Sequence, residues 1–151
     1  MISEPPVLRT ARLQLQPLSA VDAQACVARL LAPASDEAPY GPIVFALRDP
    51  DDGVIGKVGL HANGAIAAEL SYWLAPPFRG RGLMTEAVNA AVRWAHSDWR
   101  RSVLSAGHFA DDEASAAVLI KAGFLYTGVV EPRWSIARRE VAATRMMVRL
   151  A

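Results

Sequence analysis

The centre of the chain reads Glu69-Leu70-Ser71-Tyr72-Trp73-Leu74-Ala75-Pro76-Pro77-Phe78-Arg79-Gly80-Arg81-Gly82-Leu83-Met84-Thr85-Glu86-Ala87. Residues 67–74 predict a strand, and the two prolines that follow predict where it stops. Residues 83–96 predict a helix, because apolar side chains recur there every three or four positions. These apolar positions are Leu83, Ala87, Ala91 and Trp94. The segment is therefore expected to form a strand, a glycine-rich loop and a helix in succession.

The loop Arg79-Gly80-Arg81-Gly82 has the composition of an anion-binding site. Backbone N–H groups at the start of a helix have no partner within the helix, and the helix dipole makes them partly positive. Glycine lets the backbone come close to a phosphate, arginine adds charge, and Thr85 offers a hydroxyl in the first turn. The loop lacks the ending of a Walker A site and the glycine spacing of a dinucleotide fingerprint. A solvated turn is the alternative interpretation of the same four residues.

The N-terminal half predicts an antiparallel meander. Residues 12–16 alternate polar and apolar side chains, and Ser19 can cap a helix over 19–31 that Pro33 ends. The segment 34–42 then serves as a connection. Strands are expected at 43–48 and 54–61, with hairpin turns at 49–53 and at Asn63-Gly64.

The C-terminal part adds a strand at 102–106, a helix at 113–122 and two closing strands at 124–130 and 141–150. Asp111-Asp112 can cap the helix, and Gly123 can end it. The predicted fold class is α/β in the α+β sense, with a mixed, mostly antiparallel sheet and helices on both faces. Residues 1–151 are expected to form a single domain.

The composition narrows the classes of function. Sixteen basic and 15 acidic residues nearly balance, which argues against a general nucleic-acid or membrane-surface binder. The single cysteine, Cys26, excludes an internal disulfide, and the three histidines lack ligand-like spacing, so no metal site is expected. No apolar run is long enough to cross a bilayer, and residues 1–8 do not form a signal peptide. The default expectation is a soluble cytoplasmic protein.

Two further segments complete a resemblance that spans nearly the whole chain. They read His108-Phe109-Ala110-Asp111-Asp112-Glu113-Ala114-Ser115, followed by Val118-Leu119-Ile120-Lys121-Ala122-Gly123-Phe124, and Leu8-Arg9-Thr10-Ala11-Arg12-Leu13-Gln14-Leu15. With the central segment, they resemble the GNAT superfamily of N-acetyltransferases, in the branch of the ribosomal-protein N-terminal acetyltransferases. The resemblance implies the acyl-CoA N-acyltransferase fold and acetyl-CoA as the acetyl donor.

The resemblance also implies roles for particular residues. Backbone N–H groups would hold the pyrophosphate of the cofactor along Arg79, Gly80, Arg81, Gly82, Leu83, Met84 and Thr85. Strand residues would pair with the pantetheine amides at Tyr72, Trp73 and Leu74, as an added strand would. Asp112 and Ser115 belong to the second cofactor helix. The sequence departs from the family pattern at three places, with Met84 for glycine or alanine, Asp112 for asparagine, and Leu119 for the usual catalytic tyrosine.

Acetyl transfer needs a proton acceptor for the amine and a donor for the departing thiolate. Ser115 is the candidate donor, with a purely structural first-turn serine as the alternative. Glu69 and His108 are the candidate bases, and His61 is a weaker third. Glu69 opens the strand that enters the loop, and His108 is expected just after a strand at the edge of the cleft. Without a nucleophile-elbow motif, direct attack by the amine is expected.

The sequence thus predicts an acetyl-CoA-dependent transfer to a primary amine, with a protein N-terminus as the leading acceptor. A small-molecule acceptor, such as an amino acid, a polyamine or an antibiotic, is the alternative, and a catalytically silent CoA-binding module is the third. A homodimer is compatible with the sequence. Trp134 and Arg133, Arg138 and Arg139 are expected in the connection between the last two strands. The short 34–42 connection predicts an open acceptor groove.

Overall fold

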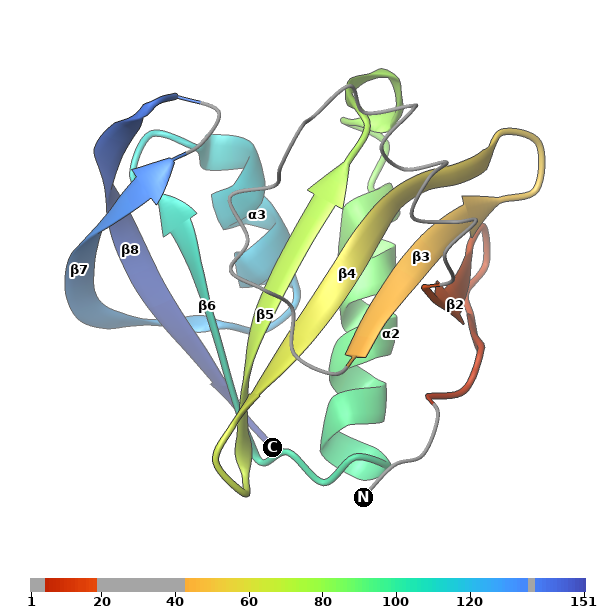
Figure 1. Ribbon diagram of the computed structural model, residues 1–151, viewed down its shortest axis with the longest axis horizontal. Coiled ribbons are helices and arrows are strands. Elements are labelled where there is room, and N and C mark those ends of the chain that lie inside the picture. Colours follow the sequence, from red (N-terminus) through yellow and green to blue (C-terminus); the bar gives the residue numbers. More distant parts are fainter. Residues whose placement is uncertain (1–4, 19–42, 136–137) are drawn as a thin grey trace.

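The computed structural model describes residues 5–18, 43–135 and 138–151. Its strands form one sheet in the order β1-β2-β3-β4-β5-β6-β8-β7. The strands are β1 (Leu8–Arg9), β2 (Gln14–Pro17), β3 (Ile43–Asp49), β4 (Gly53–Asn63), β5 (Ala67–Leu74), β6 (Val103–Phe109), β7 (Leu125–Ser135) and β8 (Glu140–Leu150). The described helices are α2 (Leu83–Ser97) and α3 (Glu113–Lys121), and a short 3-10 turn, η1 (Pro76–Phe78), follows β5. Figure 1 shows this arrangement.

The meander from β3 to β5 is the predicted one. β3 pairs with β4 and β4 with β5, both antiparallel. Gly53 and Gly64 close the two hairpins with φ of 73° and 77°, which glycine adopts without a steric penalty. The predicted strand at 67–74 matches β5 residue for residue.

Helix α2 buries the apolar face that its periodicity predicts. Leu83, Ala87, Ala91 and Trp94 are all buried in the main core. The ring of Trp94 meets the ring of Phe45, on β3, edge-on at a centroid distance of 5.5 Å, and stacks on the ring of Trp99 at 5.7 Å. The contact with Phe45 adds an aromatic interaction to the burial of apolar surface that holds the helix against the sheet.

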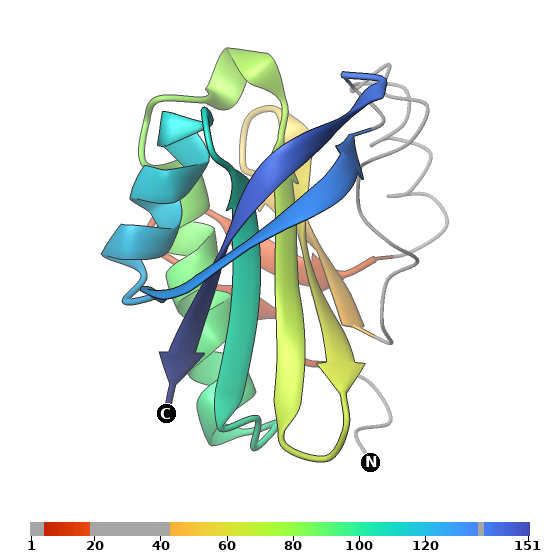
Figure 2. The ribbon, with the colours of Figure 1, turned by 90° about the vertical axis from the view of Figure 1, so that its left-hand side faces the viewer.

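Both described helices lie on one face of the sheet (Figure 2). The helix predicted from Ser19, the residue Cys26 and the 34–42 connection lie outside the described residues.

Strands β5 and β6 separate before either of them ends. They pair in parallel at Ala67↔Val103, Ala68↔Leu104 and Glu69↔Ser105. β5 then runs on to Leu74 and β6 to Phe109 without pairing with each other. Figure 1 shows the two arrows diverging, with α3 behind the gap. One edge of β5 is therefore left unpaired by β6 from Leu70 onward.

Two strands, β6 and β7, continue three or more residues beyond the ends predicted from the sequence. β6 continues through Gly107 to Phe109, where the prediction stopped at 106. A Cβ at Gly107 would lie 2.8 Å from Cγ2 of Thr144 on β8. The absence of a side chain at Gly107 therefore lets β6 continue beside β8 without a steric clash.

β7 likewise continues to Ser135, where the prediction stopped at 130. It lies at the edge of the sheet, where Pro132 is tolerated, and a register shift between Tyr126 and Val130 accommodates Gly128 at φ 85°. Arg133 and Trp134 are consequently strand residues. The connection between the last two strands was predicted at 131–140, and in the structure it begins only after Ser135.

A polar network ties the N-terminal segment to the start of α2. The Glu86 carboxylate accepts hydrogen bonds from the hydroxyl of Thr10 and from both the backbone N–H and Nε of Arg12. Nη1 of Arg12 also donates to the carbonyl oxygen of Arg81, at 2.9 Å. Burial opposes ionisation of Glu86, but the hydrogen bonds from Thr10 and Arg12 outweigh it and lower the pKa of the carboxyl below its ordinary value. The network clamps the glycine-rich loop from outside.

We predict that the substitution Glu86→Gln destabilises the protein by about 1 kcal/mol at neutral pH, because it removes a charged acceptor of three hydrogen bonds. Since the folded-state pKa is the lower one, the carboxylate stabilises the fold above the ordinary pKa of 4.5 and loses this effect as the pH falls through the folded-state value. The difference in unfolding free energy between wild type and variant should shrink below pH 4.5 in urea titrations.

The matched control is Glu113→Gln, because Glu113 is an exposed glutamate in the first turn of the other described helix. It should give a smaller difference at pH 7. A difference for Glu86→Gln that stayed constant from pH 7 to pH ~3 would contradict the assignment of the lowered pKa to this network.

Candidate active site

The loop before α2 presents backbone donors to a ligand. Gly80 and Gly82 have φ of 80° and 76°, in the left-handed region, and Gly82 is the N-cap of the helix. The first bond at the start of the helix runs from the N–H of Glu86 to the carbonyl of Gly82, at 3.1 Å. Because no side chain caps this end, the N–H groups of Leu83, Met84 and Thr85 have no helical acceptor.

The two arginines of the loop support its shape in different ways. Nε of Arg79 donates to the carbonyl of Leu74 at 2.8 Å, and its guanidinium lies 5.5 Å from the Trp73 ring centroid. This contact joins the loop to the end of β5. Nη2 of Arg81 donates to the carbonyl of Pro77 at 3.3 Å, and its guanidinium lies 5.8 Å from the Phe78 ring centroid.

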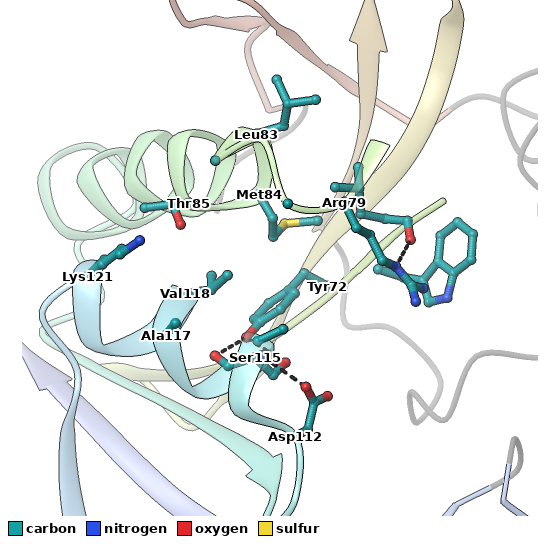
Figure 3. Close-up of a pocket in the computed structure, with 15 residues that line it drawn as sticks. Tyr72, Arg79, Leu83, Met84, Thr85, Asp112, Ser115, Ala117, Val118 and Lys121 are labelled. Carbon is teal, nitrogen blue, oxygen red and sulfur yellow. Dashed lines mark hydrogen bonds between the residues drawn. The ribbon is translucent and has the colours of Figure 1, made fainter. Parts of the chain in front are cut away.

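A cavity of about 380 Å³ lies between the end of β5, the loop, the start of α2 and one side of α3 (Figure 3). Every residue predicted to bind the cofactor lines it except Arg81. These are Tyr72, Trp73, Leu74, Arg79, Gly80, Gly82, Leu83, Met84, Thr85, Asp112 and Ser115. The structure thus brings together residues more than 40 positions apart in the chain.

Four lining residues were missed in the sequence. They are Ala114, Ala117, Val118 and Lys121, all on α3. They recur at intervals of three, one and three positions, which is the spacing of one helix face, and that spacing is the signal that could have identified them. The small side chains leave room for a ligand, and Lys121 adds a positive charge.

Tyr72 and Ser115 form a hydrogen-bonded pair in the wall of the cavity (Figure 3). The Tyr72 hydroxyl lies 3.0 Å from Oγ of Ser115 and 3.1 Å from its carbonyl oxygen. Asp112 accepts a bond from the N–H of Ser115 at 3.1 Å, which is the N-cap contact predicted for it. Burial raises the pKa of Tyr72 to about 12, the Ser115 bond opposes the rise, and the Asp112 charge adds to it, so the phenol is neutral at physiological pH.

Glu69 lies on the other face of the sheet from this pair. Successive side chains of a strand alternate between faces, and Tyr72 points toward α3, so Glu69, three residues before it, points away. The Glu69 carboxylate pairs with Arg133 of β7 at 2.8 Å, and Arg133 also reaches Glu131 at 3.3 Å. His61 is the cross-strand partner of Glu69 and is exposed. Glu69 sits where β5 and β6 stop pairing, although it does not line the cavity.

The sequence predicted His108 just after a strand, at the edge of the cleft, whereas in the structure it is a residue of the strand itself. It lies within β6 and is 5% exposed. Nδ1 lies 2.7 Å from the carbonyl oxygen of Phe109, and Nε2 lies 2.8 Å from the hydroxyl of Tyr126. Both ring nitrogens of His108 are therefore engaged in hydrogen bonds inside the fold, and His108, like Glu69, does not line the cavity.

The remaining predicted features fall as follows. Leu119, at the position of the family tyrosine, is fully buried in the core. Met84 is also buried, so its longer side chain fills the core beside the loop. Arg138 and Arg139 are both exposed, and Arg138 pairs with the exposed carboxylate of Asp111.

Within the described residues, no three His, Cys, Asp or Glu side chains are grouped to hold a metal ion. None of the described helices is long and apolar enough to span a membrane.

Comparison with known proteins agrees with this geometry. Residues 1–125 match the acetyltransferase (GNAT) domain family. A Bacillus subtilis (strain 168) protein named Probable N-acetyltransferase YjcK is 37% identical over 82 residues, which cover 52% of this chain and 45% of that protein. The chain therefore matches less than half the length of this relative.

Two solved structures share the fold at low sequence identity. The ribosomal-protein-S5-alanine acetyltransferase of Vibrio fischeri superposes with a TM-score of 0.81 at 16% identity, over 97% of both chains. The acetyltransferase of Agrobacterium tumefaciens strain C58 gives 0.74 at 22% identity, over 100% of this chain and 98% of that one. The predicted fold class is confirmed, and because the family match spans residues 1–125 of 151, the chain belongs to the GNAT acetyltransferase family.

Proposed function

We propose that this protein transfers the acetyl group of acetyl-CoA to a primary amine, and that the amine is the α-amino group at a protein N-terminus. The observation that carries the proposal is the cavity between β5, α2 and α3. It combines free backbone donors at a helix start, an unpaired strand edge and a hydroxyl pair. Each suits a different part of an acyl-CoA molecule.

The loop suits the pyrophosphate. Two consecutive phosphates carry negative charge, which the N–H groups after Gly82 and the positive end of α2 stabilise. The unpaired edge of β5 over residues 70–74 suits the amides of pantetheine, which can bond to a strand as a neighbouring strand would. Two structural neighbours support this choice of donor. One is the MccE acetyltransferase, in complex with acetyl-CoA and AMP, and the other is RimL, in complex with coenzyme A.

The acceptor amine would approach from the face that carries Glu69. An ionised carboxylate attracts an ammonium group and can take its proton, directly or through water. Arg133 holds this carboxylate in place at the point where the strands separate. Attack by the neutral amine on the thioester carbonyl then forms the C–N bond and releases the thiolate toward Ser115.

A protein N-terminus is the proposed acceptor because it presents an unhindered amine on a flexible chain, which can enter between two diverging strands. Structural neighbours whose names state such acceptors include the Vibrio fischeri S5-alanine enzyme and RimL, a ribosomal L7/L12 alpha-N-protein acetyltransferase. Since these neighbours are 15–16% identical to this chain, they support the fold and leave the acceptor to experiment.

We predict that Gly80→Asp weakens acetyl-CoA binding about tenfold more than Gly80→Asn, as measured by calorimetric titration. Both side chains have the same shape and both tolerate a positive φ better than other residues do. A Cβ at Gly80 meets no atom within 4 Å, so both variants should fold. Only the aspartate adds a negative charge beside the proposed pyrophosphate site.

Equal affinities of the two variants at low ionic strength would contradict the phosphate site at the loop. A wild-type protein that bound no acetyl-CoA would contradict the proposed function as a whole.

The acceptor is tested with synthetic peptides that carry free or blocked N-termini, compared with amino acids, polyamines and aminoglycosides at equal concentration. We expect mass spectrometry to detect acetylation of the free α-amino peptides and none of the blocked ones. The variant Glu69→Gln should lower kcat at least about tenfold while leaving acetyl-CoA affinity within a factor of about two. If a small amine were acetylated faster than the peptides, the proposed acceptor would be wrong and a small molecule would take its place. If acetyl-CoA bound but no amine were acetylated, a catalytically silent CoA-binding module would be favoured.

A further inference from the structure

Ser115 is held by three contacts in the wall of the cavity. Its N–H donates to Asp112, and its carbonyl oxygen and Oγ both lie within 3.1 Å of the Tyr72 hydroxyl. The serine is thus fixed at the first turn of α3, and its hydroxyl is the part that can still rotate. Its partner Tyr72 belongs to β5 and also lines the cavity.

The pair has only two hydroxyl hydrogens to distribute. In one arrangement Tyr72 donates to the carbonyl oxygen of Ser115, and Ser115 donates to the phenol oxygen, so that both hydrogens stay within the pair. In the other, Tyr72 donates to Oγ, and the Ser115 hydrogen is free to point into the cavity. The distances from the Tyr72 hydroxyl to the carbonyl oxygen and to Oγ of Ser115, 3.1 Å and 3.0 Å, permit both arrangements.

We propose that Tyr72 is a positioning residue for acetyl transfer, which donates its hydrogen to Oγ of Ser115 and so directs the hydrogen of Ser115 to the departing sulfur. This inference rests on the proposed function. As the amine nitrogen bonds to the carbonyl carbon, the C–S bond breaks and its electron pair goes to sulfur. Ser115 donates a hydrogen bond to that sulfur, and Tyr72 retains its own proton throughout. The attacking nitrogen loses a proton as the amide forms, to Glu69 directly or through water, and a proton from solvent finally converts the thiolate to the thiol.

Three observations support this assignment over simple packing. Burial raises the pKa of the Tyr72 phenol to about 12, so the phenol stays protonated near neutral pH and remains a donor. Leu119 leaves the α3 position of the family tyrosine without a hydroxyl, and it is fully buried. The pair also lines the cavity directly, so a donor at Ser115 meets the ligand without any rearrangement of the backbone.

The first test measures the thiol pKa of bound coenzyme A and needs no acceptor. The carbon-13 shift of the methylene next to sulfur is followed against pH in complexes with the wild type, Tyr72→Phe, Ser115→Ala and the double variant. A hydrogen bond to the thiolate lowers the thiol pKa. We expect a value about one unit higher in Ser115→Ala than in the wild type, about half a unit higher in Tyr72→Phe, and no further rise in the double variant.

The outcomes separate this inference from the proposed function. Normal binding of coenzyme A with equal thiol pKa values in wild type and Tyr72→Phe would overturn the role of Tyr72 alone. Additive effects in the double variant would do the same, because they would show that Tyr72 acts without Ser115. Failure of the wild type to bind coenzyme A would overturn the proposed function, and this inference with it.

Kinetics give the second readout. With the acceptor that reacts, Tyr72→Phe should lower kcat about fivefold with little change in KM, and Ser115→Thr should keep more activity than Ser115→Ala. Thr127→Val controls for the loss of a hydroxyl, because the Thr127 hydroxyl bonds to the Met146 carbonyl on β8, and Thr127 does not line the cavity. A Tyr72→Phe variant with wild-type kcat would contradict the proposal.

Discussion

The separation of β5 from β6 after Glu69 and Ser105 is the constraint on which the site depends. If the strands stayed paired to their ends, the backbone of β5 would be satisfied on both sides, and no ligand could bond to its edge. Their divergence leaves a backbone edge of β5 free of β6, and α3 lies on the side of the sheet where that edge is exposed to the cavity. The loop at the start of α2 then supplies charge stabilisation at one end of the same space.

Three groups of contacts hold this arrangement open. Arg79 joins the loop to the end of β5, Tyr72 joins β5 to α3, and Arg133 reaches from β7 to Glu69. On the other side of β5, Gly56 allows close approach of β4, since a Cβ there would lie 2.4 Å from the carbonyl oxygen of Trp73. Each of these contacts joins residues of different elements, so they fix the relative positions of elements rather than their internal structure.

Local patterns predicted much of this molecule. The meander, the strand at 67–74, the glycine-rich loop, α2 and the Asp112 cap all follow from periodicity and turn chemistry within a few residues. The network of Thr10, Arg12 and Glu86 could not be predicted in this way. Thr10 and Arg12 are 76 and 74 positions from Glu86, and the sequence around a charged residue does not indicate which distant residue it will pair with. The strand ends at 106 and 130 failed for a related reason, since Gly107 and Pro132 are tolerated only because of their neighbours in the sheet.

Backbone amide shifts during titration with coenzyme A would test the central claim most directly. The account predicts that the amides of Gly80, Gly82 and Leu83 move together with those of β5 after Leu70 and of Ser115 to Val118, at one affinity. The amides of β2 and β3, on the far side of β4, should stay in place. Shifts confined to another part of the chain, or none at all, would contradict the assignment of this cavity to acyl-CoA.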